Sequence, residues 1–237
     1  MPEAAERKAL GEGLKHLDEN MRTVAELGEL ALRKAVVGLD GDPGDEAAQV
    51  FAIDREIYGL KQEIVKECVE LIALHAPVAG DLRTITASLE ITTDVDRIGR
   101  YSKDIAEVVQ ELDHGADSGL DQLPELRQMG ERTIAMIHRS LTSFLNREHV
   151  SVPEIIRADD EVDRLHDIVF RKIIDGISAR AISPRIGAHL ILVNRYLERL
   201  SDHAVNIGGH VAYMVTGDLP EPMPRPHEAR QTSLGGV

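Results

Sequence analysis

Acidic and amide side chains recur at every fourth position in two stretches of the second half of the chain. The later line is Glu198, Asp202 and Asn206, and the earlier line is Asp159, Asp163 and Asp167. In an α-helix each residue turns the chain by about 100°, so this spacing places each line along one side of its helix. Both lines fall largely opposite the apolar residues of the same stretch. We therefore expect the oxygen atoms to project away from each helix's apolar seam.

Two antiparallel neighbouring helices could bring these lines side by side. Five carboxylates and one amide would then converge, with His166 or His203 beside them. Because like charges repel, such a cluster favours a cation. Carboxylate oxygens with some imidazole suit iron, manganese, magnesium or, less well, zinc. Acidic residues at this spacing also line solvated helix faces, so the spacing alone leaves a metal site and an ordinary surface open.

The composition excludes several classes of protein. The chain has 237 residues, with 27 basic and 41 acidic side chains and a net charge of −14. Such a charge repels nucleic-acid phosphates, so we expect no DNA or RNA partner. Cys68 is the only cysteine, which rules out an intrachain disulfide and a cysteine-based zinc site. We find no signal peptide and no apolar run near the roughly 20 residues of a membrane span, so we expect a cytoplasmic protein without membrane insertion.

The positions of the apolar residues predict an all-α protein. Leucine, valine, isoleucine and methionine recur every three or four residues, which is helical spacing. Glycine and proline clusters separate the periodic stretches, and Ser151 and Ser183 precede prolines as helix N-caps do. The predicted helices cover residues 10–40, 45–74, 81–112, 123–147, 151–178 and 183–216. The proline-rich segment 218–237 cannot bury enough apolar surface to order itself, so we predict a disordered tail.

The two halves of the chain match one another. Three stretches align, at offsets of 110, 105 and 102 residues: Arg22–Ala25 with Arg132–Ala135, Asp54 with Asp159, and Asp96–Ile98 with Glu198–Leu200. Matches at the same places in all three helices indicate a duplication. We therefore predict a tandem repeat of two three-helix bundles, at residues 10–113 and 120–217.

The third predicted helix of each half carries a repeated motif. Asp94–Gly99 (Asp-Val-Asp-Arg-Ile-Gly) and Glu198–Ala204 (Glu-Arg-Leu-Ser-Asp-His-Ala) resemble the Asp-Leu-Glu-Arg-Ile-Gly-Asp-His-Ala signature of the PhoU family. Asp81–Arg83, upstream, fits the family pattern as well. The resemblance extends over about residues 10–216. Members of this family are phosphate-transport accessory and phosphate-response regulatory proteins.

The resemblance implies a fold, a site and a function. The family fold is two three-helix bundles side by side, often with metal clusters held on the bundle surface by the Glu/Asp-x-x-x-Asp motif. Members act in the cytoplasm as negative regulators of the phosphate-starvation response. They are thought to connect a Pst-type phosphate transporter, through its ATPase subunit, to a sensor histidine kinase. Many form homodimers, and they are not enzymes.

The first half departs from the motif at a position that would bind metal. Arg100 stands where the second half has Asp202. A guanidinium is always charged and would take the electrostatic role of a cation. We therefore expect Asp96, Arg100 and Asp104 to form a ladder of i,i+4 ion pairs in place of a metal ion.

Other first-half positions agree with a degenerate site. Asp54 keeps the first acid of the second helix, but Tyr58 and Gln62 follow where the second half has further aspartates. Tyr101 stands in the place of His203. We predict that the first half binds metal weakly or not at all, and that any metal is held in the second half.

Two motif arginines, Arg97 and Arg199, sit beside the acidic lines. A guanidinium readily pairs with carboxylates, so we expect both to orient the acids of their own helix. A role as phosphate ligands is the alternative for the same pair.

A different class of protein also has to be weighed, namely a ferritin-like helical-bundle enzyme with a carboxylate-bridged di-metal centre. Such a centre needs a Glu-x-x-His on each of two helices, facing the bundle core. The only such pair here is Glu111 with His114, at a predicted helix end, and Asp163 with His166 is an approximate match. No nucleophile triad, phosphate loop or cofactor fingerprint is recognisable. The sequence favours a non-enzymatic regulatory adaptor with no organic cofactor.

Overall fold

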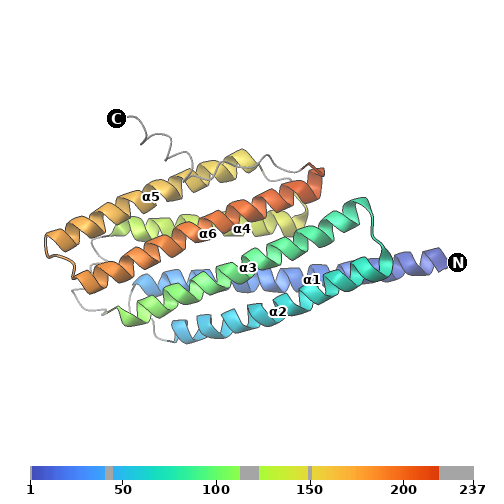
Figure 1. Ribbon diagram of the computed structural model, residues 1–237, viewed down its shortest axis with the longest axis horizontal. Coiled ribbons are helices and arrows are strands. Elements are labelled where there is room, and N and C mark those ends of the chain that lie inside the picture. Colours follow the sequence, from blue (N-terminus) through green and yellow to red (C-terminus); the bar gives the residue numbers. More distant parts are fainter. Residues whose placement is uncertain (1, 41–44, 113–122, 149–150, 219–237) are drawn as a thin grey trace.

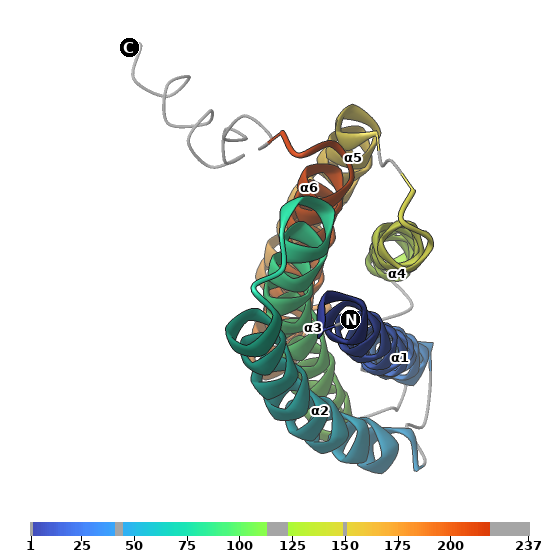
Figure 2. The same cartoon turned by 90° about the vertical axis from the view of Figure 1, so that its right-hand side faces the viewer.

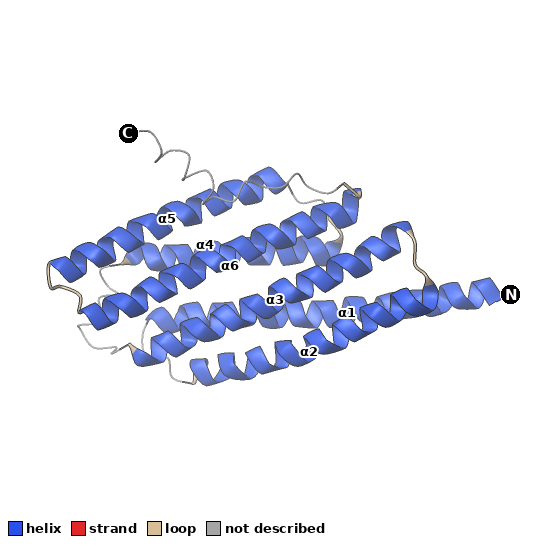
Figure 3. Cartoon of the chain, in the orientation of Figure 1, coloured by secondary structure: helices blue, strands red, loops and turns tan. Residues whose placement is uncertain are grey.

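Six α-helices account for nearly all of the described part of the chain, as the apolar periodicity predicts. The computed structural model describes residues 2–40, 45–112, 123–148 and 151–218, and this part of the chain contains no β-strand (Figures 1 and 3). A single 3₁₀ turn, Gly38–Asp40, follows the first helix. The helices are α1 (Pro2–Val37), α2 (Glu46–His75), α3 (Ala79–Glu111), α4 (Pro124–Asn146), α5 (Val152–Ser178) and α6 (Pro184–Thr216).

The observed helix ends agree closely with the predicted ones, except that α1 begins at Pro2 and not near residue 10. Ser183 caps α6 as predicted, since its side chain accepts a hydrogen bond from the Ile186 amide at 3.3 Å. Ser151 precedes α5 in an extended conformation but makes no side-chain cap. The predicted linker at 114–119 and all but the first residue of the predicted tail at 218–237 lie outside the described residues.

Each half of the chain forms its own three-helix bundle, in which every helix contacts the other two. The first bundle consists of α1, α2 and α3, and the second of α4, α5 and α6. Figure 2 shows that α2, α3, α6 and α5 form one curved layer, with α1 and α4 on its concave side. The bundles meet mainly where α3 packs on α6, with a smaller contact between α1 and α4. The two motif-bearing helices therefore lie side by side at the centre of the molecule.

Aliphatic side chains at helical spacing fill the core of both bundles. On α3 the fully buried residues include Ile91, Val95 and Ile98, and α6 contributes their counterparts Val193, Leu197 and Leu200. At about 25 cal/mol per Å² of buried apolar surface, such stripes supply the main driving force for the bundle. Within the described residues, none of the helices combines the length and apolar character needed to cross a bilayer.

A small residue in the motif sets the spacing between helices. A Cβ atom on Gly99 of α3 would lie 2.8 Å from the Ile57 side chain of α2, so glycine permits this close approach. In the second bundle the matching residues are Ser201 and Val162, both buried. Valine is shorter than isoleucine by one methyl group, and that space accommodates the serine. The Ser201 hydroxyl lies 2.8 Å from the backbone carbonyl of Glu198, one helical turn earlier on the same helix.

Candidate functional site

Four carboxylates of the second bundle lie close enough to perturb one another: Asp159 and Asp163 on α5, and Glu198 and Asp202 on α6. We call this set the carboxylate quartet. The helices run antiparallel, and the Asn194 side chain donates to the His166 carbonyl at 3.0 Å further along. This register places Asp167 near Asn194, at one end of the contact. Asn206 lies at the opposite end, so neither residue belongs to the quartet.

The prediction that both acidic lines project away from the core is wrong for their first members. Asp159 and Glu198 are only 7% and 3% exposed. Asp163, Asp167 and Asp202 are half-buried, and Asn206 is exposed. The reason lies in helix geometry, because residues four apart drift by about 40° per step. Each line therefore starts in the interface between helices and winds outward to the surface.

Burial and mutual repulsion raise the pKa values of two acids of the quartet. Burial, followed by repulsion from Asp163, Asp202 and Glu198, raises the pKa of Asp159 to about 7, although a hydrogen bond from Ser201 opposes the change. Burial, followed by Glu198 and Asp163, raises the pKa of Asp202 to about 6. Such values mean that the folded protein holds protons here near neutral pH.

One arginine compensates part of the charge. Nη1 of Arg195 donates to Oε1 of Glu198 at 2.8 Å, and the two residues are one helical turn apart. Oδ1 of Asp159, in contrast, is buried without a hydrogen-bond partner in the part of the chain that the structure describes. A buried carboxylate oxygen in that state is costly unless a proton or a cation reaches it.

In the first bundle, basic side chains neutralise the equivalent buried acids. Asp54 and Asp96 occupy the positions of Asp159 and Glu198, and both are buried. Nζ of Lys61 lies 2.9 Å from Oδ2 of Asp96, and Nε of Arg100 lies 3.6 Å from Oδ1 of Asp54. The repeat offsets place Lys61 at the position of a histidine and Arg100 at that of an aspartate in the second bundle.

The predicted ladder along α3 is therefore not the observed arrangement. Arg100 reaches across to α2, and Asp96 is paired with a lysine of α2, so the ion pairs run between helices. Asp104 is half-buried, and burial followed by the nearby Glu107 raises its pKa. Asp96 is already paired with Lys61, so Arg100 is left to pair with the buried Asp54 of the neighbouring helix.

The last motif positions meet across the contact between the bundles. Nδ1 of His203 lies 2.8 Å from Oδ1 of Asp94, and the rings of Tyr101 and Tyr196 have their centroids 5.8 Å apart. Under the 102-residue offset Asp94 corresponds to Tyr196, and Tyr101 to His203. The Asp–His and Tyr–Tyr contacts are thus equivalents of each other under the repeat. His203, expected as a possible metal ligand, instead joins α6 to α3.

Comparison with known proteins identifies the family to which this fold and motif belong. The sequence model of the PhoU domain matches residues 21–109 and again residues 126–211. The chain belongs to the PhoU family. The predicted resemblance and the tandem three-helix fold are both confirmed.

Relatives that match over most of their length belong to the same family. A phosphate-specific transport system accessory protein PhoU homolog from Zymomonas mobilis is 30% identical over 220 residues, covering 90% of this chain and 92% of that protein. The corresponding homolog from Deinococcus radiodurans is 34% identical over 175 residues, with coverages of 73% and 80%. The crystal structure of PhoU from Pseudomonas aeruginosa superposes with a TM-score of 0.79 at 29% identity, covering 88% of this chain and 99% of that one.

The donor chemistry of the quartet in this PhoU-family chain suits a hard cation. Carboxylate oxygens are the ligands that magnesium, manganese and iron accept, and the buried Oδ1 of Asp159 is an acceptor that such an ion would satisfy. Across the described residues, however, no group of three or more His, Cys, Asp or Glu side chains is gathered as a ready-made metal site. Binding would require the half-buried Asp163 and Asp202 side chains to turn toward Asp159.

Two residues that sequence reasoning missed do the work expected of the motif arginines. Arg97 and Arg199 are exposed, and the described part of the chain offers neither an ion pair. Arg195 and Lys61 instead contact the buried acids Glu198 and Asp96. The repeat alignment, extended by two helical turns from Asp54, places Lys61 opposite His166 and so gives a signal for this extra cation.

The alternative of a core di-metal centre gains no support from the positions of its candidate residues. Oε2 of Glu111 lies 3.2 Å from Nε2 of His189, and the glutamate is exposed at the end of α3. His114 lies outside the described residues. His166 is half-buried, with Nδ1 3.4 Å from the Asn194 carbonyl. A Glu-x-x-His pair facing the bundle core is therefore absent among the described helices.

Proposed function

We propose that this protein is a regulatory accessory component of a phosphate-specific transport system, and that it acts in the cytoplasm as a negative regulator of the phosphate-starvation response. The observation that carries the proposal is the match of both PhoU domains, together with relatives named for that transport system along almost their whole length. The finer role we propose is that of an adaptor. It would contact the ATPase subunit of the transporter and a sensor histidine kinase, without catalysing a reaction.

The adaptor role has a direct test in cells and with purified proteins. Deletion of the gene should release the phosphate-starvation response in phosphate-replete medium, and the full-length chain should restore control. Tagged protein should retain the transporter's ATPase subunit and the sensor kinase in separate pull-downs. Unchanged regulation in the deletion strain would contradict the phosphate role, whereas normal regulation by a chain that binds neither partner would contradict only the adaptor role.

For the acidic site, the proposal is that the second bundle holds a divalent or trivalent cation and the first does not. The support is electrostatic, because two carboxyl groups of the quartet have strongly raised pKa values. In the first bundle, Lys61 and Arg100 already neutralise the equivalent acids. Manganese, iron or magnesium fits the oxygen donors best, and zinc fits less well.

Metal content of matched variants tests this asymmetry. Glu198→Gln/Asp202→Asn should abolish retention of manganese or iron after purification, whereas Asp96→Asn/Asp104→Asn should leave it unchanged. Elemental analysis gives the metal content, and circular dichroism shows whether each variant keeps its helices. Equal loss in both variants would contradict the asymmetric site while leaving the regulatory role standing.

The oligomeric state follows from the family resemblance alone, and we propose a homodimer. Light scattering on the purified chain should give about twice the 26.1 kDa of one chain. A monomer at micromolar concentration would contradict this proposal.

A further inference from the structure

Histidines of the second bundle pair with carboxylates of the first at both contacts between the bundles. Where α1 meets α4, Nδ1 of His138 lies 2.8 Å from Oε2 of Glu29. Where α3 meets α6, the buried Asp94 has two histidine neighbours on α6. Its Oδ1 lies 2.8 Å from Nδ1 of His203, and its Oδ2 lies 3.7 Å from Nε2 of His210. Imidazole groups are thus the main basic partners across this boundary in the described part of the chain.

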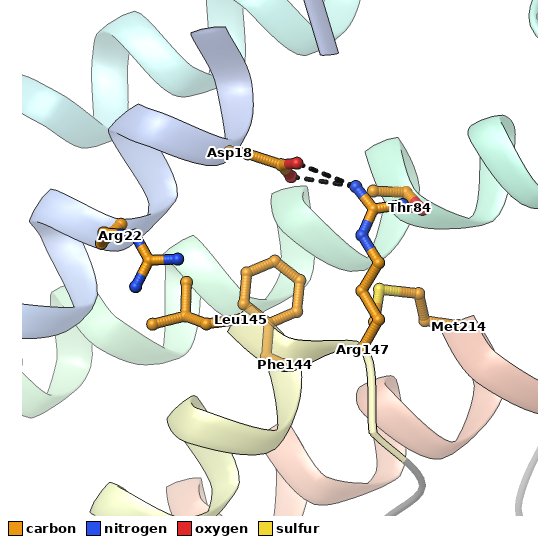
Figure 4. Close-up of a pocket in the computed structure, with 7 residues that line it drawn as sticks. All are labelled: Asp18, Arg22, Thr84, Phe144, Leu145, Arg147 and Met214. Atoms are coloured by element: carbon orange, nitrogen blue, oxygen red, sulfur yellow. Dashed lines mark hydrogen bonds and ion pairs between the residues drawn. The ribbon is translucent and has the colours of Figure 1, made fainter. Parts of the chain in front are cut away.

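The remaining ion pairs between the bundles, among the described residues, are one of each kind. Oε2 of Glu111 lies 3.2 Å from Nε2 of His189. Figure 4 shows the other pair, in which Nη2 of Arg147 donates to both carboxylate oxygens of Asp18, at 3.2 and 2.9 Å. Most ion pairs inside the bundles use lysine or arginine instead. Because histidine changes its charge between about pH 5 and 8 and guanidinium does not, pH acts mainly on the contact between the bundles.

The two carboxylates lie at one level of the first bundle. A Cβ atom on Gly28 of α1 would lie 2.8 Å from the Val95 side chain of α3, so the two helices touch closely at these residues. Glu29 and Asp94 are their neighbours in sequence. Both acids therefore face the second bundle from the same height along the first.

The second bundle presents its histidines at the matching level. The Ser140 hydroxyl donates to the Ala204 carbonyl at 2.8 Å, which ties α4 to α6 there. His138 comes two residues before the serine, and His203 directly before the alanine. His210 follows two helical turns later, on the same side of α6 as His203. Acids and histidines thus form one layer across four helices.

The charge on His138 decides how strong its pair is. Burial acts to raise the pKa of Glu29, but hydrogen bonds from His138 and Arg33 hold it below its ordinary value, so the carboxylate is ionised wherever histidine titrates. A charge-assisted hydrogen bond is about twice as strong as a neutral one. The neighbouring Arg139 is directed to Glu154 of α5, and no ion pair from α6 reaches His138 among the described residues. Protonation of His138 therefore strengthens the α1–α4 contact.

His210 faces Asp94 as its charged partner. On α3 the exposed Glu90 lies one turn before Asp94, and Nε of Arg83 donates to a backbone carbonyl near the end of α6. No ion pair from α4 or α5 reaches His210 in the part of the chain that the structure describes. His203 is next to an acid of the carboxylate quartet, where a metal ion would govern its titration, so we leave it aside. We call the Glu29–His138 and Asp94–His210 pairs the histidine clasp.

We propose that the histidine clasp is a pH-sensitive device, which holds the two bundles together when His138 and His210 are protonated and releases them when they lose their protons. A histidine with a carboxylate partner in the joined state binds its proton more tightly there. Its contribution is present at low pH and is lost as pH rises through the range of histidine titration, about pH 6 to 7. The smaller α1–α4 contact should open first. The proposal depends neither on the transport role nor on a metal ion.

The distance between the outer helices α2 and α5 in the full-length chain tests the clasp. Spin labels on Gln62→Cys and Arg164→Cys, both at exposed positions, report this distance by pulsed electron paramagnetic resonance, and the native Cys68 is buried. With a chelator present, the distance should be longer and more broadly distributed at pH 8 than at pH 6. The reason is that the curved layer flattens when α1 and α4 separate on its concave side (Figure 2).

Variants of the paired residues separate the clasp from a general effect of charge. Glu29→Gln should remove roughly half of the pH response, because it breaks one of the two pairs, and His138→Gln/His210→Gln should remove nearly all of it. Asp18→Asn is the matched control on the same α1–α4 contact. Its partner is an arginine, so it should shift the distance equally at both pH values and keep the response.

Circular dichroism at both pH values shows whether each variant keeps its helices. Three results would each overturn the proposal: equal distances at pH 6 and pH 8 in the labelled parent, a full pH response in His138→Gln/His210→Gln, or a loss of the response in Asp18→Asn as large as in Glu29→Gln.

Discussion

The raised pKa of Asp159 makes a quantitative prediction for the metal-free protein. A carboxyl group whose folded pKa exceeds its unfolded value binds its proton more tightly in the folded state. Its stabilising effect is therefore present at low pH and is lost as pH rises from the unfolded value of 3.8 through about 7. Because one pKa unit corresponds to about 1.4 kcal/mol, full ionisation costs at most about 4 kcal/mol.

The substitution Asp159→Asn removes the charge and keeps the shape. Relaxation and the coupling among the four acids reduce the gain, and we expect the variant to be more stable than the parent by about 2 kcal/mol at pH 8. Its amide N–H groups can also donate to Glu198 or Asp202. At pH 5 the difference should fall to less than half of that value, and it should vanish only near pH 4, where the unfolded carboxyl is protonated as well. Urea unfolding with a chelator at both pH values measures the two free energies.

Asp54→Asn in the first bundle is the matched control. Asp54 has the same 7% exposure as Asp159, but Arg100 lies 3.6 Å away. Its replacement should lower stability by about 1 kcal/mol at both pH values, since it removes the partner of a cation. A loss of stability in Asp159→Asn at pH 8, or an equal gain in both variants, would refute the reasoning that Asp159 lacks the cation that its equivalent Asp54 has.

Three further predictions concern packing and charge. Gly130→Val should lower the free energy of unfolding by about 2 kcal/mol, because even a Cβ atom there would lie 2.9 Å from the branched Val36 side chain of α1. An unchanged midpoint of urea unfolding would contradict this close contact. Lys61→Met should lower the free energy of unfolding by about 3 kcal/mol, because it leaves Asp96 buried and unpaired. Adding Asp96→Asn should restore part of the lost stability. A double variant no more stable than the single one would argue against the ion pair. Cys68 is fully buried, and burial raises its pKa to about 12, so thiol reagents should label it at pH 8 only on unfolding, and rapid labelling of the native chain would contradict its placement.

The helices and the duplication could be predicted from the sequence because both depend on local spacing. Apolar residues at three- and four-residue intervals define each helix, and prolines and glycines mark the ends. The cap at Ser183 forms as its residue type predicts. The alignment of the halves also identified Arg100 as a cation in an acid's position. These features are properties of a helix and its neighbours in sequence.

The charge partners could not be predicted in the same way, because they depend on how helices pack. Lys61 and Asp96 are 35 residues apart and meet only once α2 lies on α3. The depth of Asp159 and Glu198 depends on where each acidic line starts relative to the helix interface. The Asp94–His203 pair and the Tyr101–Tyr196 pair, which are equivalent under the repeat, form only because α3 packs on α6. Spacing within one helix does not contain this information.

Both bundles keep the fold, but in the first bundle Lys61 and Arg100 lie beside the two buried acids, whereas in the second Arg195 pairs with Glu198 and Asp159 has no ion pair among the described residues. Our central proposal is that a metal ion takes that place in the second bundle. The most direct measurement is the metal stoichiometry of the variant Tyr58→Asp/Lys61→His/Arg100→Asp, which gives the first bundle the residues of the second at these positions. By calorimetric titration with manganese, we predict that the variant binds more metal per chain than the unmodified protein, for which we propose binding in the second bundle alone. Equal stoichiometry in the two proteins, or no binding by either, would contradict the claim.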